Sequence, residues 1–195
     1  DNDTLYGEGD AVAYDFSTNG YNISRTAGAT WTSGGRYGGA YRCALADGSE
    51  NLYSGSSPPI LGKFTLSAWV NRTGQPTGSN NNIIDVGTYA QGFAMWIDAS
   101  NRVAWRIDDD YIHYQDNATL SLNKWEHVAI VYDQSTIKIY RNGTKVTQEP
   151  YSTDPTTLTN YIRLCARENM DEVFNGTIDE VRIWNAALDS TTIQQ

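Results

Sequence analysis

The chain carries little positive charge and has no long apolar segment. Its 195 residues include 14 lysines and arginines against 23 aspartates and glutamates, a formal net charge of -9. Because nucleic-acid phosphates are bound through lysine and arginine, this balance argues against a nucleic-acid partner. No run of 18 apolar residues occurs, so we expect no membrane insertion. The chain begins at Asp1 without a methionine or a secretory signal, and we interpret it as a mature or excised piece.

Cysteine is scarce, and its spacing leaves two interpretations open. Cys43 and Cys165 lie far apart and form neither a CxxC pair nor a cluster of metal ligands. As two buried thiols they would act as small apolar groups. As one disulfide they would join an early strand to a late strand.

Helical periodicity is almost absent, and the apolar pattern has a period of two. Residues 102–108 turn Val103, Trp105 and Ile107 to one face, and residues 64–70 alternate in the same way. This alternation is typical of strands with one buried face. No linker and no internal repeat divides the chain. We therefore predict an all-β fold, one antiparallel β-sandwich domain of two curved sheets spanning the whole sequence.

Local turn signals support this prediction. Asn142-Gly143 between two alternating runs predicts a type I′ hairpin, because both central residues of that turn need a positive φ. Residues 98–102 predict a second tight hairpin. The end of the chain predicts one turn of helix, capped by Asp189 or Ser190.

Four segments occur in a familiar order along the chain. They are "WTSGGRYGGAYRC" (31–43), "KFTLSAWVNRTG" (63–74), "KWEHVAIVYDQSTIKIYRNGTKV" (124–146) and "FNGTIDEVRIWNAAL" (174–188). Together they resemble the concanavalin A-like jelly roll in its laminin-G-like form, over roughly residues 10 to 193. The resemblance implies two curved antiparallel sheets packed face to face, with a concave front sheet.

The sequence departs from the family pattern at both cysteines. Cys43 stands where relatives usually have phenylalanine, and Cys165 stands where they often have glycine. Two unusual positions that are both cysteine favour the disulfide. A bridge requires the two Cα atoms to lie within about 7 Å, and therefore neighbouring strands.

The resemblance also implies a structural calcium site at the edge of the sandwich. The matching residues are Asp15, Asn19 and Asp179, because carboxylate and carbonyl oxygens suit this hard cation. Such a site would need the last strand to return beside the first. In the alternative interpretation, Asp15 and Asn19 only shape a turn and Asp179 packs near a strand end.

Catalytic patterns are missing from the sequence. Glycosidases of this broad fold carry an E-x-D-x-x-E stretch, which does not occur here. A retaining mechanism needs two carboxyl groups about 5 Å apart, and we interpret the densest acidic run, residues 108–110, as a solvated loop. There is no Ser-x-His pattern, and the resemblance makes His127 a structural residue. We expect a domain that is not an enzyme.

A ligand surface is predicted on the concave face. Aromatic rings stack on sugars, while arginine and other polar groups bond to their hydroxyls. Alternation points some of these side chains away from the core, and others fall in a nearby loop. The predicted ligand-binding residues are Trp69, Trp96, Arg106, Tyr111, His113 and Tyr114. Alternatively, the aromatic residues fill the shallow sheet or a subunit contact.

Six N-x-[ST] sequons suggest a glycosylated, extracellular chain. They begin at Asn2, Asn22, Asn71, Asn117, Asn142 and Asn175. We expect a non-catalytic recognition domain, secreted or at the cell surface, that binds glycans or cell-surface polysaccharide or mediates adhesion. Two alternatives are a self-associating structural subunit of an extracellular fibre or surface layer, and an accessory module of a secreted hydrolase.

Overall fold

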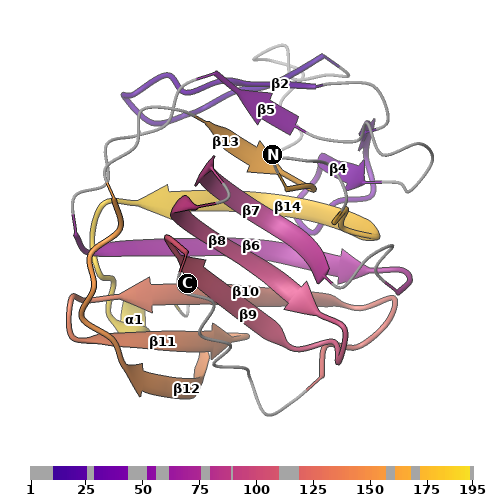
Figure 1. Ribbon diagram of the computed structural model, residues 1–195. Coiled ribbons are helices and arrows are strands. Elements are labelled where there is room, and N and C mark those ends of the chain that lie inside the picture. Colours follow the sequence, from indigo (N-terminus) through magenta and orange to yellow (C-terminus); the bar gives the residue numbers. More distant parts are fainter. Residues whose placement is uncertain are drawn as a thin grey trace.

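Two layers of antiparallel strands make up the computed structural model. The structure describes residues 11–25, 29–43, 52–55, 62–75, 80–88, 90–109, 119–156, 161–167 and 172–193. Figure 1 looks through one layer, with β7, β8 and β9 in front, onto β14, β6 and β10 of the other. The predicted all-β antiparallel sandwich is confirmed.

The strands form two seven-stranded sheets, here called sheet 1 and sheet 2. Sheet 1 has the order β1 (Val12–Ala13), β2 (Ile23–Arg25), β5 (Leu52–Ser54), β13 (Ile162–Leu164), β7 (Asn80–Thr88), β8 (Gln91–Asp98) and β9 (Val103–Ile107). Sheet 2 has the order β12 (Thr144–Pro150), β11 (Thr136–Arg141), β10 (Trp125–Tyr132), β6 (Phe64–Arg72), β14 (Gly176–Trp184), β4 (Ala40–Cys43) and β3 (Thr30–Thr32). The one described helix is α1 (Ser190–Ile193). No described helix has the length and apolar character needed to cross a membrane.

The core fills the space between the two inner faces. Phe64 of sheet 2 stacks on Phe93 of sheet 1, with ring centroids 4.5 Å apart. Trp105 is 1% exposed and meets Tyr151 edge to face. The alternation predicted for residues 64–70 and 102–108 is confirmed, because the apolar residues assigned to the inner faces all belong to the core cluster between the sheets, whereas Ala104 belongs to a separate cluster. Fully burying each large apolar side chain contributes about 1.5–3 kcal/mol.

The predicted turns are also confirmed. Asn142 and Gly143 have φ values of 48° and 77° and connect β11 to β12. The Asp98 carboxylate accepts the backbone N–H groups of Ser100 and Arg102 in the turn between β8 and β9. Asp189 caps α1, because its carboxylate accepts the Thr192 amide at 2.8 Å.

Strand β14 lies inside sheet 2, between β6 and β4. The expectation that it returns beside the first strand is wrong, because β1 pairs with β2 at the edge of sheet 1. The "FNGTIDEVRIWNAAL" segment therefore forms a central strand. It connects the long strand β6 to the short strands β4 and β3 at one edge of sheet 2.

Cys43 and Cys165 form a disulfide with a Cα–Cα distance of 5.8 Å. Both residues are almost completely buried. Cys43 ends β4 in sheet 2, while Cys165 directly follows β13 in sheet 1. The two strands face each other across the core instead of pairing within one sheet. The bridge is thus a covalent link between the layers.

Cys165 has a backbone conformation that glycine adopts at lower cost. Its φ is +74°, in the left-handed region that disfavours side chains with a Cβ atom. This agrees with the glycine that relatives often have at this position. Here the chain accepts the backbone strain and gains a bridge that closes a separation of 122 residues.

Replacing both cysteines should lower the free energy of unfolding by about 2–5 kcal/mol, because a long loop loses its covalent constraint. Urea unfolding of Cys43→Ala/Cys165→Ala measures this loss. The matched variant Cys43→Ala/Cys165→Gly should be more stable than the alanine pair by about 1 kcal/mol, since glycine tolerates the positive φ. An alanine pair as stable as the glycine pair would contradict this account of position 165.

Candidate functional site

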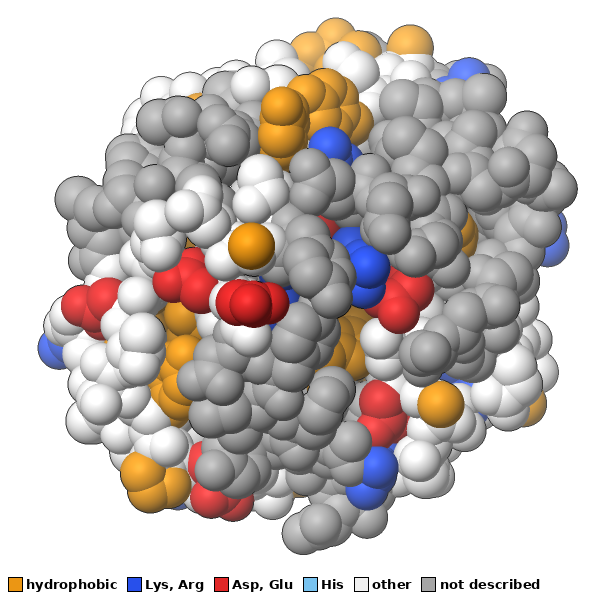
Figure 2. Space-filling view, in the orientation of Figure 1, with side chains coloured by type: hydrophobic (Ala, Val, Ile, Leu, Met, Phe, Trp, Pro, Cys, Tyr) orange, Lys and Arg blue, Asp and Glu red, His pale blue; other side chains and the backbone are white. Residues whose placement is uncertain are grey.

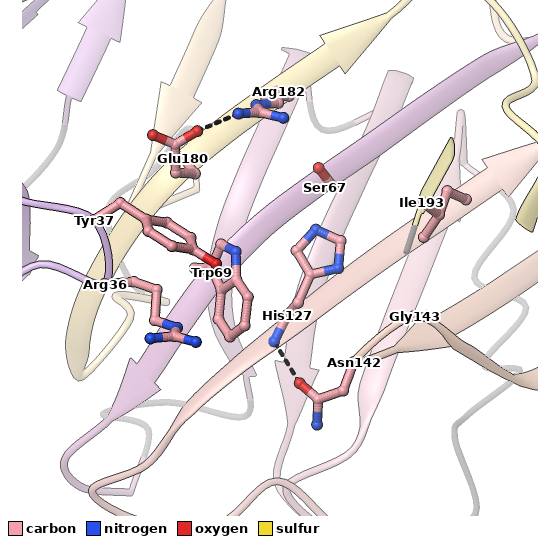
Figure 3. Close-up of a pocket in the computed structure, with 10 residues that line it drawn as sticks. All are labelled: Arg36, Tyr37, Ser67, Trp69, His127, Asn142, Gly143, Glu180, Arg182 and Ile193. Carbon is pink, nitrogen blue, oxygen red and sulfur yellow. Dashed lines mark hydrogen bonds and ion pairs between the residues drawn. The ribbon is translucent and has the colours of Figure 1, made fainter. Parts of the chain in front are cut away.

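A hollow of about 570 Å³ opens on the outer face of sheet 2, and we call it the Trp69 hollow. Trp69 of β6 and His127 of β10 are cross-strand partners on its floor, with ring centroids 5.5 Å apart (Figure 3). Ser67 lies two residues before Trp69 and therefore shares its face. Ile193 of α1 and the Asn142-Gly143 turn complete one side of the hollow.

A β-bulge in β14 shapes the second side of the hollow. Asp179 pairs with Trp69 and Arg182 pairs with Ser67, with a register shift between them. In a regular strand, residues three apart face opposite sides, so the inserted residue keeps Asp179 and Arg182 on one face. Glu180 has φ +49° within the bulge and forms an ion pair with Arg182 beside the hollow (Figure 3).

The loop between β3 and β4 forms the third side and is held by Asp179. The Oδ2 atom of this buried carboxylate accepts the backbone N–H of Arg36 at 2.7 Å and that of Tyr37 at 3.0 Å. Gly35 turns too tightly for a side chain, because a Cβ atom there would lie 2.7 Å from the Gly38 carbonyl oxygen. The carboxylate and the tight turn fix the position of Arg36 and Tyr37.

Aromatic rings and a guanidinium meet at the centre of the hollow. The Arg36 guanidinium carbon lies 4.7 Å from the Trp69 ring centroid and 4.9 Å from that of Tyr37. Tyr37 meets Trp69 edge to face at 5.9 Å and is 50% exposed. These distances are typical of cation–π and aromatic pairing. The hollow therefore offers apolar ring surface next to positive charge.

His127 supplies a neutral polar group to this surface. Its partial burial, together with the nearby Arg182 cation, lowers the pKa of the imidazole below its usual range. The ring is then neutral at pH 7 and can both donate and accept a hydrogen bond. Its backbone N–H donates to the Asn142 side-chain oxygen at 2.9 Å, which ties β10 to the β11–β12 turn.

Two predicted ligand-binding residues lie on the opposite side of the molecule. Trp96 and Arg106 are on the outer face of sheet 1, and each is 3% exposed. The expectation that they share a face with Trp69 is wrong. Alternation separates core from non-core residues, but it does not say which sheet a strand joins. Side chains that point away from the core lie on opposite sides of the molecule when their strands belong to different sheets.

The outer face of sheet 1 holds a buried ion pair. The Arg106 guanidinium donates to the Asp85 carboxylate at 3.0 Å and to the Thr88 carbonyl oxygen. Trp96 packs beside this pair with Ala94 and Ala104. Figure 2 views the molecule from this side, and acidic and basic side chains are interspersed on its described part. These residues therefore have a structural role.

The remaining predicted positions divide between described and undescribed residues. Tyr111, His113, Tyr114, Asn2 and Asn117 lie outside the described residues. The other four sequon asparagines differ in exposure: Asn22 and Asn142 are exposed, whereas Asn71 and Asn175 are half-buried. The Asn175 side-chain nitrogen, the atom that would carry a glycan, donates instead to the Gln75 carbonyl oxygen. Glycosylation stays a prediction.

The three predicted calcium ligands all take part in hydrogen bonds within the protein. Asp15 accepts N–H groups of Ser17 and Tyr21 and so shapes a turn in which Asn19 also bonds to Ser17. Asp179 accepts N–H donors at both oxygens.

Within the described part of the chain, no group of three or more His, Cys, Asp or Glu side chains is arranged to hold a metal. Calcium binding stays a prediction, which thermal unfolding with calcium and with a chelator can test.

Several residues of the hollow were not among the predicted ligand-binding positions. They are Arg36, Tyr37, Glu180 and Arg182. The sequence carries a signal for the first pair, since "GGRYGG" sets an arginine and a tyrosine between glycine pairs that favour a tight turn. Glu180 and Arg182 have the two-residue spacing of one strand face, but the sequence gives no signal for the bulge between Asp179 and Arg182.

The architecture places the molecule among concanavalin A-like jelly rolls. The chain belongs to the concanavalin A-like lectin/glucanases superfamily, because the Laminin_G_3 family model matches residues 46–194. The predicted resemblance is thereby confirmed. No curated protein matches the chain in sequence.

Solved structures share this fold at low sequence identity. The binding domain of Paraclostridial Mosquitocidal Protein 1 has a TM-score of 0.75 and 17% identity, over 95% of this chain and 50% of that one. The botulinum neurotoxin serotype G binding domain has a TM-score of 0.67 and 18% identity, over 95% and 49%. This chain thus spans about half the length of these toxin binding domains.

A third structure is matched over most of its own length. Domain 4 of AbnA, an extracellular arabinanase from Geobacillus stearothermophilus, was solved in complex with arabinotriose. Its TM-score is 0.66 at 20% identity, over 85% of this chain and 79% of that domain. The structural neighbours are binding or lectin-like domains.

The structural role of the Arg106–Asp85 pair can be tested by urea unfolding. Arg106→Ala should lower the free energy of unfolding by about 3–5 kcal/mol, because the buried Asp85 carboxylate loses its cationic partner. The control is Arg102→Ala, which breaks the partly exposed pair with Asp98 and should cost about 1 kcal/mol or less. Equal losses in the two variants would contradict the structural role.

Proposed function

We propose that the chain is a non-catalytic carbohydrate-binding domain of a secreted or cell-surface protein, and that the Trp69 hollow is its binding site. The central observation is the half-buried Trp69 ring, flanked by Tyr37, Arg36 and His127. Sugar rings present apolar faces that stack on such aromatic surfaces. Amide, imidazole and guanidinium groups at the rim can bond to sugar hydroxyls.

The same hollow is poorly equipped for glycoside hydrolysis. Glu180 is the one carboxylate among the described residues that line it, and it is held in the ion pair with Arg182. Hydrolysis with retention or inversion uses two carboxyl groups, one of them protonated. Asp179 is close in sequence, but its oxygens accept backbone N–H groups. The available chemistry supports binding without cleavage.

The structural neighbours give this proposal further support. They include an arabinanase domain in complex with arabinotriose and a botulinum neurotoxin binding domain in complex with SialylT. At identities of 20% or less these proteins share the fold alone, so they support the class of function and not a particular sugar. Adhesion and self-association stay predictions.

A second candidate is an accessory module of a secreted hydrolase. The observation that favours it is the match to one domain of an extracellular arabinanase over 79% of that domain. This alternative keeps the same binding site but gives it the task of delivering a neighbouring enzyme to its polysaccharide. The full-length reading frame decides between the two proposals, because an accessory module would be encoded next to a hydrolase domain.

The binding site can be tested with a tryptophan variant and a matched control. Trp69→Ala should lower the affinity for a glycan found by array screening at least tenfold, about 1.4 kcal/mol in calorimetry, because ring stacking is lost. Trp125→Ala removes a half-buried tryptophan of β10 that does not line the hollow, and it should bind like the parent. Absence of binding to every glycan tested would overturn the proposed function. If Trp69→Ala and Trp125→Ala bind the glycan equally well, the binding site lies outside the Trp69 hollow.

A further inference from the structure

The Trp69 hollow contains a cation that has no carboxylate partner among the described residues. Of the charged side chains there, Arg182 is neutralised by Glu180, whereas the Arg36 guanidinium lies against the rings of Tyr37 and Trp69. Within the described part of the chain, the Arg36 side chain makes no hydrogen bond or ion pair. Its guanidinium is exposed and keeps its N–H donors available to a ligand.

Most other described arginines donate a side-chain hydrogen bond to a carboxylate or carbonyl oxygen. They are Arg25, Arg72, Arg102, Arg106, Arg141, Arg167 and Arg182. The chain has a net charge of -9, yet no carboxylate of a described residue pairs with the Arg36 guanidinium, since the buried Asp179 carboxylate bonds to the backbone N–H of Arg36 instead. The hollow therefore presents a guanidinium with available N–H donors within an acidic protein.

The arginine is also held in place before any ligand arrives. Asp179 fixes the backbone at Arg36 and Tyr37, and the two rings limit the positions of the guanidinium. A side chain ordered in advance loses less conformational entropy on binding. Figure 3 shows the Arg36 side chain beside Trp69, on the side away from Arg182. A ligand resting on the floor of the hollow can reach it.

We propose that the Trp69 hollow selects acidic sugars, and that Arg36 binds the carboxylate of a uronic or sialic acid residue. This inference rests on the carbohydrate-binding function proposed above. The planar guanidinium can donate two parallel N–H bonds to a carboxylate, a geometry that fixes both position and charge. A carboxylate uses both the charge and the N–H donors of the guanidinium, whereas a hydroxyl of a neutral sugar uses the donors alone.

Calorimetry with matched sugar pairs tests the proposal. One pair is lactose and sialyllactose, and the other is a glucose-terminated oligosaccharide and its glucuronate-terminated counterpart. The parent protein should bind the acidic member of at least one pair about tenfold or more tightly than the neutral member. The pair that shows this preference distinguishes a sialic acid from a uronic acid.

Substitutions at position 36 should remove the preference without removing binding. Arg36→Gln should bring the acidic and neutral affinities within about threefold of each other, because the acidic sugar loses a charge-assisted bond and therefore loses more affinity than the neutral sugar. Arg36→Lys should keep part of the preference, because it retains the charge but loses the planar fork. Arg42→Gln is the matched control, since it removes an exposed arginine that does not line the hollow.

His127 provides a second readout that does not depend on a variant. The charged groups of the hollow around it are Arg36, Arg182 and Glu180. A bound carboxylate should raise the pKa of His127 in an NMR titration, because negative charge stabilises the imidazolium. A neutral sugar should not raise the pKa of His127, because further burial of the imidazole favours its neutral form.

The outcomes separate this inference from the proposed function. If neutral sugars bind as well as acidic sugars and Trp69→Ala abolishes both, carbohydrate binding stands and the acidic preference is overturned. A stronger preference for a sulfated sugar than for its carboxylate counterpart overturns it as well. Retention of the preference in Arg36→Gln assigns it to another residue. If neither member of either pair binds, the acidic preference is overturned, and the glycan array decides separately whether carbohydrate binding stands.

Discussion

The candidate site depends on one buried carboxylate, that of Asp179. Burying a charge is costly unless hydrogen bonds compensate it, and here three backbone N–H groups do so, at Arg36, Tyr37 and Glu180. Hydrogen bonds to charged groups contribute about 1.5–3 kcal/mol each. These bonds join the centre of sheet 2 to the β3–β4 loop. Without them the loop would have no fixed relation to Trp69, and the hollow would lose one side.

The fold follows from local patterns and was therefore predictable. Two-residue alternation fixes which side chains enter the core, because each strand must turn one face inward. The positive φ values at Asn142 and Gly143 are a property of two adjacent residues, and so is the cap at Asp189. The disulfide is different in kind. The spacing of the two cysteines does not decide whether they are bridged. The bridge forms because β4 and β13 lie opposite each other across the core.

The candidate site was less predictable because it depends on partners far apart in the chain. Alternation pointed Trp69 and Trp96 away from the core correctly, but the sandwich has two outer faces and they lie on different ones. On one face, Arg106 is buried against a carboxylate. On the other, Arg36 stacks on rings and forms no ion pair with a described residue. Arg106 therefore has a structural role, whereas Arg36 is exposed and available to a ligand. The two arginines are distinguished only by their positions in the folded sandwich, which the sequence pattern does not give.

The sequon at Asn142 connects two predictions that oppose each other. Asn142 lines the Trp69 hollow, and its side-chain oxygen accepts the backbone N–H of His127. A glycan attached to the nitrogen of the same amide would stand at the rim and compete with any ligand for the space above Trp69. The turn also requires a residue that tolerates φ near 48°, which by itself explains an asparagine. Binding in the hollow therefore requires Asn142 to be unmodified. Among the described sequons, that leaves Asn22 as the exposed position where a glycan would not line the hollow.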